Sequence, residues 1–98
     1  MSLLVEYSLK QGQTDAQTEA LIAFVEGLKA ESDGSYHYTS FATEDPNRFI
    51  GLLEFDDEGG RQRFLETAAF KAFRDGAGAR FTAPPKATKV TLVASTRS

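Results

Sequence analysis

The sequence predicts an α+β fold whose strands and helices follow the order β-α-β-β-α-β. Two observations carry this prediction. Apolar residues recur at every second position, then at every third or fourth position, and this change of period happens twice along the chain. Clusters of Gly, Pro, Asp and Asn separate the segments that differ in period.

The chain is predicted to begin with a strand over residues 3–10 and a helix over residues 15–31. Apolar and polar residues alternate in the strand. Thr14 is expected to cap the helix, with Gln17 at the capping-box position, and Gly34 is expected to take the left-handed conformation after its end. The apolar stripe of this helix consists of Leu21, Ile22, Phe24, Val25 and Leu28.

Residues 36–43 and 48–55 are predicted to form a hairpin. Both segments are rich in aromatic and β-branched residues, which favour strands. The sequence Glu44-Asp45-Pro46-Asn47 between them is a turn signal, because proline presets a turn dihedral and Asp and Asn bond their own backbone.

Residues 58–75 are predicted to form the second helix and residues 88–96 the last strand. Gly76 and Gly78 are expected to end the helix, and Pro84-Pro85 to hold the connection extended. The apolar face of the helix consists of Phe64, Leu65, Ala68, Ala72 and Phe73. This order of elements is the ferredoxin-like arrangement, a four-stranded antiparallel sheet with two helices on one face.

Length and composition indicate one domain over residues 1–98. Eleven Lys and Arg against fourteen Asp and Glu leave a net charge of −3, which argues against nucleic-acid and anionic-membrane partners. The chain has no cysteine and one histidine, so thiolate chemistry and His-rich metal sites are excluded. Without a membrane-length apolar run or a secretory leader pattern, we expect a cytoplasmic protein.

The face of the sheet opposite the helices is predicted to be apolar. Phe49, Leu53 and Phe55 lie on one side of the third strand, whereas Ile50 and Leu52 lie on the other. Leaving such side chains in water forfeits roughly 1.5–3 kcal/mol each. We therefore expect a homodimer in which two open sheet faces pack about a two-fold axis. The alternative is a monomer with an amphipathic second face. Further apolar residues of this pattern are Leu4, Phe41 and Val93.

Five short segments of the chain match the pattern of a known family. They are Asp33-Gly34-Ser35-Tyr36-His37-Tyr38, Glu44-Asp45-Pro46, Leu53-Glu54-Phe55-Asp56-Asp57-Glu58, Ala69-Phe70-Lys71-Ala72-Phe73 and Pro84-Pro85. With these segments the chain resembles antibiotic biosynthesis monooxygenase (ABM) domains of the dimeric α/β-barrel superfamily. The resemblance implies a dimeric α/β barrel with a pocket between helices and sheet in each subunit. It also implies a monooxygenase for an aromatic or polyketide-like substrate that activates oxygen once deprotonated, so no cofactor is expected.

The chain departs from the family pattern at three positions. Asp56 stands near the place where members often carry Trp, and Phe64 and Ala69 stand where they often carry His. These departures disfavour the haem-degrading branch of the superfamily. They also favour a second hypothesis, a non-catalytic ligand-binding or structural homodimer that kept the fold and lost the reaction.

His37, Tyr38 and Glu54 are the candidate catalytic residues. The pKa of histidine lies near neutrality, so His37 is the candidate general base; the alternative is a strand histidine in the dimer interface. A tyrosine such as Tyr38 could donate to an oxyanion. Glu54 could shuttle protons, or pair with Arg48 or with a cation of the partner chain. The candidate substrate-binding residues, which could equally be ordinary core or interface, are Tyr7, Phe64, Phe70 and Phe81.

The two hypotheses predict different pockets. A pocket that holds His37 or Glu54 beside a tyrosine would support chemistry. A closed and filled space under the helices would support a structural dimer.

Overall fold

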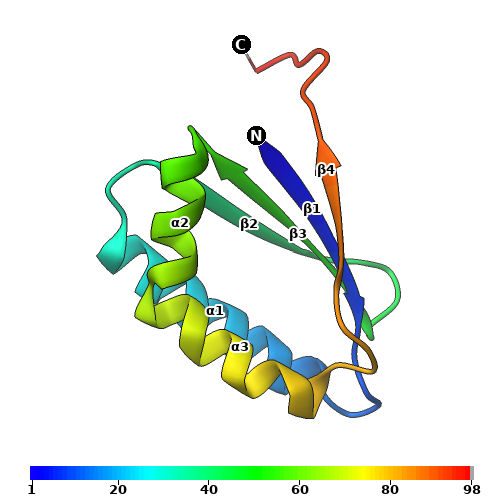
Figure 1. The fold of residues 1–98 in the computed structure, drawn as a ribbon. Coiled ribbons are helices and arrows are strands. Elements are labelled where there is room, and N and C mark those ends of the chain that lie inside the picture. The colour runs from blue at the N-terminus through cyan, green and yellow to red at the C-terminus, as the bar shows by residue number, and fades with distance from the viewer. Residues whose placement is uncertain (98) are drawn as a thin grey trace.

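The computed structural model describes residues 1–97 and confirms the predicted sheet, with one helix more than expected (Figure 1). No helix in this range is long and apolar enough to cross a membrane. The strands are β1 (Ser2–Ser8), β2 (Tyr36–Ala42), β3 (Arg48–Phe55) and β4 (Lys86–Val90). The helices are α1 (Thr14–Glu31), α2 (Glu58–Glu66) and α3 (Ala68–Arg80).

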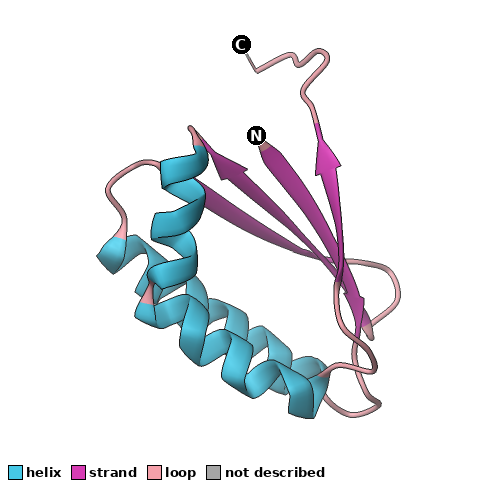
Figure 2. Cartoon of the chain, viewed as in Figure 1, coloured by secondary structure: helices cyan, strands magenta, loops and turns pink. Residues whose placement is uncertain are grey.

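The four strands form one antiparallel sheet in the order β2-β3-β1-β4. Tyr7 lies opposite Phe49 and Tyr38 opposite Leu53, so these side chains share a face. The helices pack against that face alone (Figure 2). Ile50 points to the other face, because side chains alternate along a strand. The arrangement confirms the predicted ferredoxin-like fold.

An aromatic core fills the space between the helices and the sheet. Phe64, 2 % exposed, lies at its centre, with its ring 5.1–6.0 Å from the rings of four other aromatic residues. Aromatic contacts of this kind stabilise a core beyond the area they bury. The buried apolar residues are Tyr7, Leu9, Leu21, Phe24, Leu28, Tyr36, Phe49, Leu53, Phe55, Phe64 and Phe81.

The single helix predicted over residues 58–75 is wrong, because the chain breaks at Thr67. The backbone of Thr67 is extended, with ψ at 145°, and its hydroxyl accepts from the N–H of Phe70 at 3.1 Å. The carboxylate of Glu31 accepts from the N–H groups of Ala68 and Ala69 at 3.0 and 3.1 Å. These acceptors satisfy the free N–H groups that a new helix start requires, so α3 begins as a separate helix.

The two glycines expected to end this helix lie inside α3, which continues to Arg80. Glycine within a helix costs only about 1 kcal/mol relative to alanine, which tertiary contacts can offset. Here the Nη1 of Arg80 donates to the carbonyl of Gly76 at 2.9 Å and closes the last turn.

Other differences lie at the ends of elements. Thr14 is not the cap of α1: its hydroxyl donates to the carbonyl of Pro46 at 2.8 Å and ties the helix to the β2–β3 turn. Ile22, predicted on the apolar stripe, is 61 % exposed. The last strand is shorter than the predicted residues 88–96, because β4 pairs with β1 and β1 begins at Ser2, opposite Val90.

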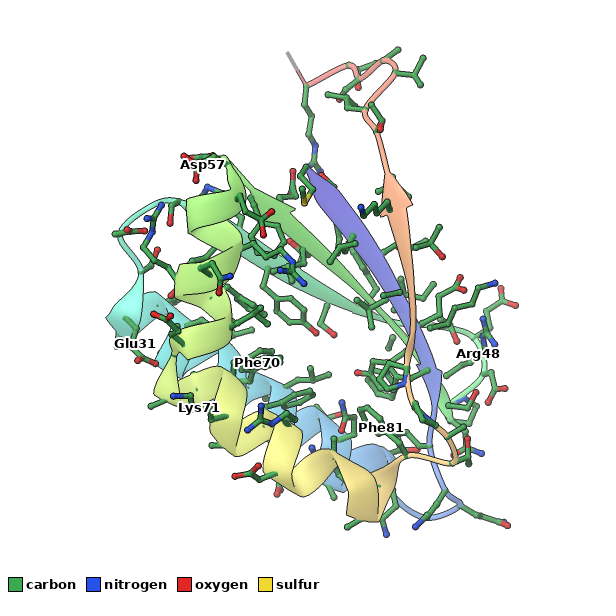
Figure 3. All side chains as sticks on the ribbon, in the orientation of Figure 1. Glu31, Arg48, Asp57, Phe70, Lys71 and Phe81 are labelled. Atoms are coloured by element: carbon green, nitrogen blue, oxygen red, sulfur yellow. The ribbon has the colours of Figure 1, made fainter. Side chains whose placement is uncertain are left out.

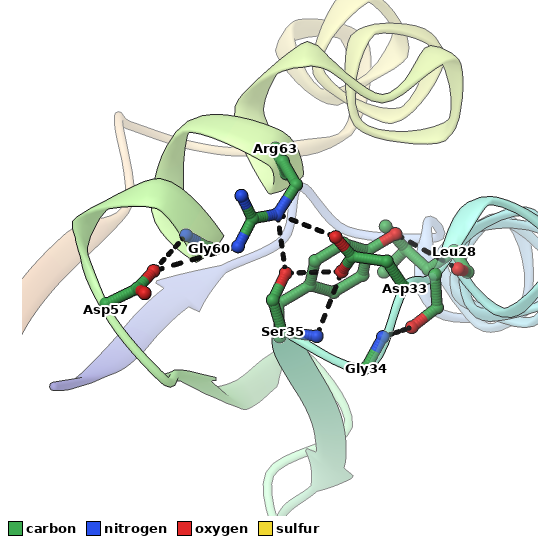
Figure 4. A network of polar contacts seen from close by, with 9 residues as sticks. Leu28, Asp33, Gly34, Ser35, Asp57, Gly60 and Arg63 are labelled. Atoms are coloured by element: carbon green, nitrogen blue, oxygen red, sulfur yellow. Dashed lines mark hydrogen bonds and ion pairs between the residues drawn. The ribbon is translucent and has the colours of Figure 1, made fainter.

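A polar network joins the turn after α1 to the start of α2 (Figure 4). The Nε of Arg63 donates to the hydroxyl of Ser35 at 2.9 Å and lies 2.8 Å from the carboxylate of Asp33. Asp57 caps α2 by accepting from the N–H of Gly60 at 2.8 Å. These charged groups are about half exposed, so each pair contributes little stability. Their effect is to hold α2 over the end of β2.

We predict that Glu31→Gln lowers the melting temperature at pH 7, because it removes the charge that caps α3. The N–H groups of Ala68 and Ala69 hold the pKa of the Glu31 carboxyl below its ordinary value of 4.5. The stabilisation is therefore present above pH 4.5 and is lost as the pH falls below it. Thermal unfolding from pH 7 to pH 3 should show the variant and the wild type converging.

Glu26→Gln is the matched control, since Glu26 lies on α1 with its side chain largely exposed. That variant should melt like the wild type throughout. A Glu31→Gln protein as stable as the wild type at pH 7, or equally weakened at pH 3, would contradict the capping role.

Candidate functional site

The sheet separates the predicted catalytic residues. His37 and Glu54 lie opposite each other in the β2–β3 register and are exposed on the open face. Tyr38 is half-buried and packs against the core on the helix side. The structure therefore does not bring all three residues into one pocket. His37 and Tyr38 do share a hollow of about 260 Å³ at the β2 edge, whose walls also include Tyr36. Within residues 1–97, no ion pair joins Glu54 to Arg48.

The four predicted substrate-binding residues all belong to the core on the helix side or pack against it. Figure 3 labels two of them, Phe70 and Phe81. Phe64 is enclosed by other aromatic rings in the core. Phe70 and Phe81 instead line a cavity, and Tyr7 stacks on Phe81 with 4.3 Å between ring centres. Phe70 and Phe81 are thus the predicted residues that a ligand can reach directly.

The cavity, of about 540 Å³, opens between α3 and the segment that leads to β4. It has the size and the apolar walls of a site for a small, flat molecule. Neither His37 nor Glu54 lines it. Its walls include Phe70, Phe73, Ala77, Phe81, Pro84 and Pro85.

Tyr7 belongs to a buried polar chain that links the sheet to the end of α3. The Nε2 of Gln17, a residue with no exposed surface, donates to the Tyr7 hydroxyl oxygen at 2.7 Å. The Oε1 of Gln17 accepts from the Nε of Arg80 at 2.7 Å. Because Gln17 donates to one lone pair of the Tyr7 oxygen, the O–H of Tyr7 is left to donate elsewhere.

The hydroxyl of Tyr7 is protonated at neutral pH. Burial, followed by the proximity of Tyr38, raises the pKa of Tyr7 to about 12. Burial also raises the pKa of Tyr38. The nearby hydroxyl of Ser40 opposes both shifts, although its oxygen has no hydrogen-bond partner among residues 1–97. The two phenols are therefore hydrogen-bond donors under physiological conditions.

Arg80 supplies positive charge at the other end of this chain. Its Nη2 is buried and has no hydrogen-bond partner among the described residues. Its guanidinium lies 5.5 Å from the ring centre of Phe73, which is also a cavity wall. A buried, unpaired guanidinium N–H favours an anionic oxygen as a partner. Arg80 itself lines a neighbouring hollow between α1 and α3 and does not line the cavity described above.

Gln17 and Arg80 are site residues that the sequence reasoning missed. Gln17 was predicted in a capping box, but it lies four and seven residues before Leu21 and Phe24, both buried. This spacing places Gln17 on the buried face of α1, so the helical period contained the signal. Arg80 carried no local signal, since its contact with Gln17 spans 63 residues.

Within residues 1–97, no group of three or more His, Asp and Glu could hold a metal ion.

Comparisons with known proteins agree with this architecture. Residues 1–76 match the family model described as antibiotic biosynthesis monooxygenase. No curated protein matches the chain.

Solved structures share the fold over nearly the whole chain. A protein of unknown function from Nitrosomonas europaea is 26 % identical with a TM-score of 0.81, and the match covers 99 % of this chain and 92 % of that one. A protein from Pseudomonas aeruginosa is 21 % identical with a TM-score of 0.80, covering 95 % and 93 %. A structure entitled antibiotic biosynthesis monooxygenase is 17 % identical with a TM-score of 0.80, covering 95 % and 98 %.

We predict that Gln17→Leu destabilises the protein by about 1–3 kcal/mol, because it leaves the Tyr7 oxygen and the Arg80 Nε buried without a partner. Urea unfolding at pH 7 measures this difference. Gln62→Leu, at an exposed position of α2, is the control and should change stability little. A Gln17→Leu protein as stable as the wild type, or more stable, would show that the hydrogen bonds of Gln17 to Tyr7 and Arg80 do not contribute to stability.

Proposed function

The chain belongs to the antibiotic biosynthesis monooxygenase family, and on this premise we propose that it oxidises an aromatic or polyketide-like small molecule without a cofactor. The observation that carries the proposal is the aromatic-walled cavity beside the buried Arg80–Gln17–Tyr7 chain. Phe81 connects the two, since it lines the cavity and stacks on Tyr7.

In the proposed reaction the substrate supplies the electrons. A phenol or enol bound as its anion gives electrons to O₂, and a CH₂ group becomes a carbonyl. One oxygen atom enters the substrate, and the other leaves as water with the two hydrogens that are removed. The site would favour the anion because the positive charge of Arg80 lowers the pKa of a bound phenol or enol.

The tyrosines, the phenylalanines and the residues of the open face would have separate roles. Tyr7 and Tyr38 do not line the cavity itself, and they would donate hydrogen bonds to an anionic oxygen that reaches past the ring of Phe81, which stabilises charge as it develops. Phe70 and Phe81 would hold the flat ring of the substrate. For His37 and Glu54 we propose the interface role that the sequence left open, because both lie on the open face.

One observation favours the alternative, a binding protein without a reaction. Ala69 stands where family members often carry His. An added Cβ on Gly27 of α1 would lie 2.8 Å from the Cβ of Ala69. The glycine thus lets α1 approach the methyl group of Ala69, which offers no base or ligand atom at this position. A protein of this kind would keep the cavity and bind the same class of ligand.

We also propose that the protein is a homodimer joined through the open sheet face. Leu4 lies opposite Leu52 and Phe41 opposite Ile50, so four apolar side chains share this face. Phe41 is 49 % exposed in the single chain. A second copy placed about a two-fold axis would bury these groups. The cytoplasmic location remains a prediction of the sequence.

The functional proposal predicts binding and turnover of hydroxylated naphthalenes and anthrones. These compounds should raise the melting temperature of the wild type and of His37→Ala alike. Oxygen consumption should fall roughly a hundredfold in Tyr7→Phe, since one donor to the anion is lost. His37→Ala should keep its oxygen consumption.

Two outcomes separate the alternatives. Stabilisation by these compounds without oxygen consumption would support the binding protein over the enzyme. Loss of turnover in His37→Ala would instead restore His37 as the base and contradict the assignment made here.

The dimer proposal predicts that Leu52→Glu converts the protein to single chains. A charge on this strand would be buried without a partner, and such burial costs several kcal/mol. Sedimentation velocity at micromolar concentration measures the mass. Ala79→Glu, exposed on α3, should leave the mass of two chains unchanged. A wild type that sediments as one chain would refute the interface.

A further inference from the structure

The cavity beside α3 has one charged side chain among the walls that the structure describes, and it belongs to Arg74. Phe70, Arg74, Ala77 and Phe81 follow one another at intervals of three or four residues along α3 and its end. Residues at this spacing share one side of a helix, so the sequence places Arg74 between two aromatic walls. A ligand in the cavity therefore meets a positive charge.

The position of the Arg74 guanidinium suits contact with a ligand. It lies over the ring of Phe70, 5.8 Å from the ring centre, and such a contact between a cation and an aromatic face is attractive. The side chain is 61 % exposed, which puts it on the solvent side of the cavity. The carboxylate of Asp75 lies 3.7 Å from its Nη2, but that pair is open to water and therefore weak. The guanidinium can exchange it for an anion of a ligand.

The other walls offer few polar groups that would compete with Arg74. Pro84 and Pro85 have no N–H group to donate. The hydroxyl of Thr82 donates to the carbonyl of Ser8 at 3.2 Å. A single arginine beside apolar walls is typical of a site for a flat ring that carries a carboxylate, because the planar guanidinium can bind both carboxylate oxygens with parallel N–H groups.

Arg74 stands well away from the end of the cavity that adjoins Tyr7. Phe70 and Phe81 mark the beginning and the end of α3 (Figure 3), and Phe81 stacks on Tyr7. Along a helix, the distance from Arg74 to Phe81 is a rise of about 10 Å. A fused-ring compound with an acid group at one end and a hydroxyl at the other would span this distance.

We propose that the ligand of this cavity is a hydroxylated fused-ring carboxylic acid, and that Arg74 binds its carboxylate. This inference rests on the proposed function and narrows its substrate class. The hydroxyl end would enter toward Phe81 and Tyr7, and the acid end would stay at the solvent side. Arg74 would thus select and orient the ligand without taking part in the oxidation.

Binding is measured with a hydroxynaphthoic acid whose hydroxyl and carboxyl groups lie at opposite ends of the ring system, and with the methyl ester of the same acid. The wild type should bind the acid roughly tenfold more tightly than the ester, because the ester cannot form the charge-assisted pair with Arg74. Arg74→Gln should bind the two compounds alike. Isothermal titration calorimetry at pH 7 gives the dissociation constants.

Lys71→Gln is the matched control. It removes the same charge from the same helix, but Lys71 does not line the cavity. This variant should keep the preference of the wild type for the acid. Arg74 and Lys71 are both exposed, so both variants should fold, and their melting without ligand checks this.

Turnover separates a role in specificity from a part in the reaction. Arg74 would touch the carboxylate and not the carbon that is oxidised, so Arg74→Gln should raise the KM for the acid and leave kcat unchanged. With the ester, the variant and the wild type should have the same KM. A fall in kcat at unchanged KM would overturn the role in specificity.

The outcomes separate this inference from the proposed function on which it rests. If the wild type binds acid and ester equally, or if Arg74→Gln still prefers the acid, the role of Arg74 is overturned and the cavity stays a site for neutral rings. Loss of the preference in Lys71→Gln overturns it as well, since the general charge of α3 then explains the effect. Tight binding of the acid without oxygen consumption contradicts the proposed reaction and supports the carboxylate contact. A wild type that binds neither compound overturns both.

Discussion

The constraint on which this structure depends is that a four-stranded sheet has two faces and the helices cover one. Residues of even and odd number along each strand therefore meet different surroundings. On the covered face, aromatic side chains close a core around Phe64 and leave a cavity beside α3. On the other face, Leu4, Ile50 and Leu52 are only half-buried. The cavity and the proposed interface thus follow from the same alternation.

The covered face also explains how a short chain can build a polar site. A buried glutamine is tolerated only when both ends of its amide are bonded, and Gln17 satisfies this with Tyr7 and Arg80. The amide fixes the Tyr7 oxygen and the Arg80 side chain relative to each other. In the proposed function, the Tyr7 O–H and the Arg80 Nη2, which has no hydrogen-bond partner among residues 1–97, would stabilise an anionic oxygen.

The sequence predicted those elements whose signals are local. The bounds expected for the third strand, 48–55, match β3, because a turn precedes it and acidic capping residues follow it. The break at Thr67 was not predictable, because the carboxylate that caps α3 comes from Glu31, far back in the chain. The early end of β4 is also non-local, since it is set by where β1 begins.

The candidate site was predicted in part for the same reason. Aromatic residues on the helix side could be named from their spacing, whereas the face on which a strand residue lies depends on the register. His37 and Glu54 therefore came out on the face away from the cavity, and their roles stay predictions. For Gln17 the local pattern suggested a capping role, whereas its helical spacing from Leu21 and Phe24 places it on the buried face of α1.

One titration can show whether a ligand binds on the helix side of the sheet or on the open face. Side-chain NMR signals of Phe70, Phe81 and His37 are followed while a hydroxylated naphthalene is added. If the ligand binds in the cavity beside α3, the signals of Phe70 and Phe81 shift as it is added and the signals of the His37 ring do not. Shifts centred on the His37 ring would place the ligand on the open face and contradict binding in the cavity.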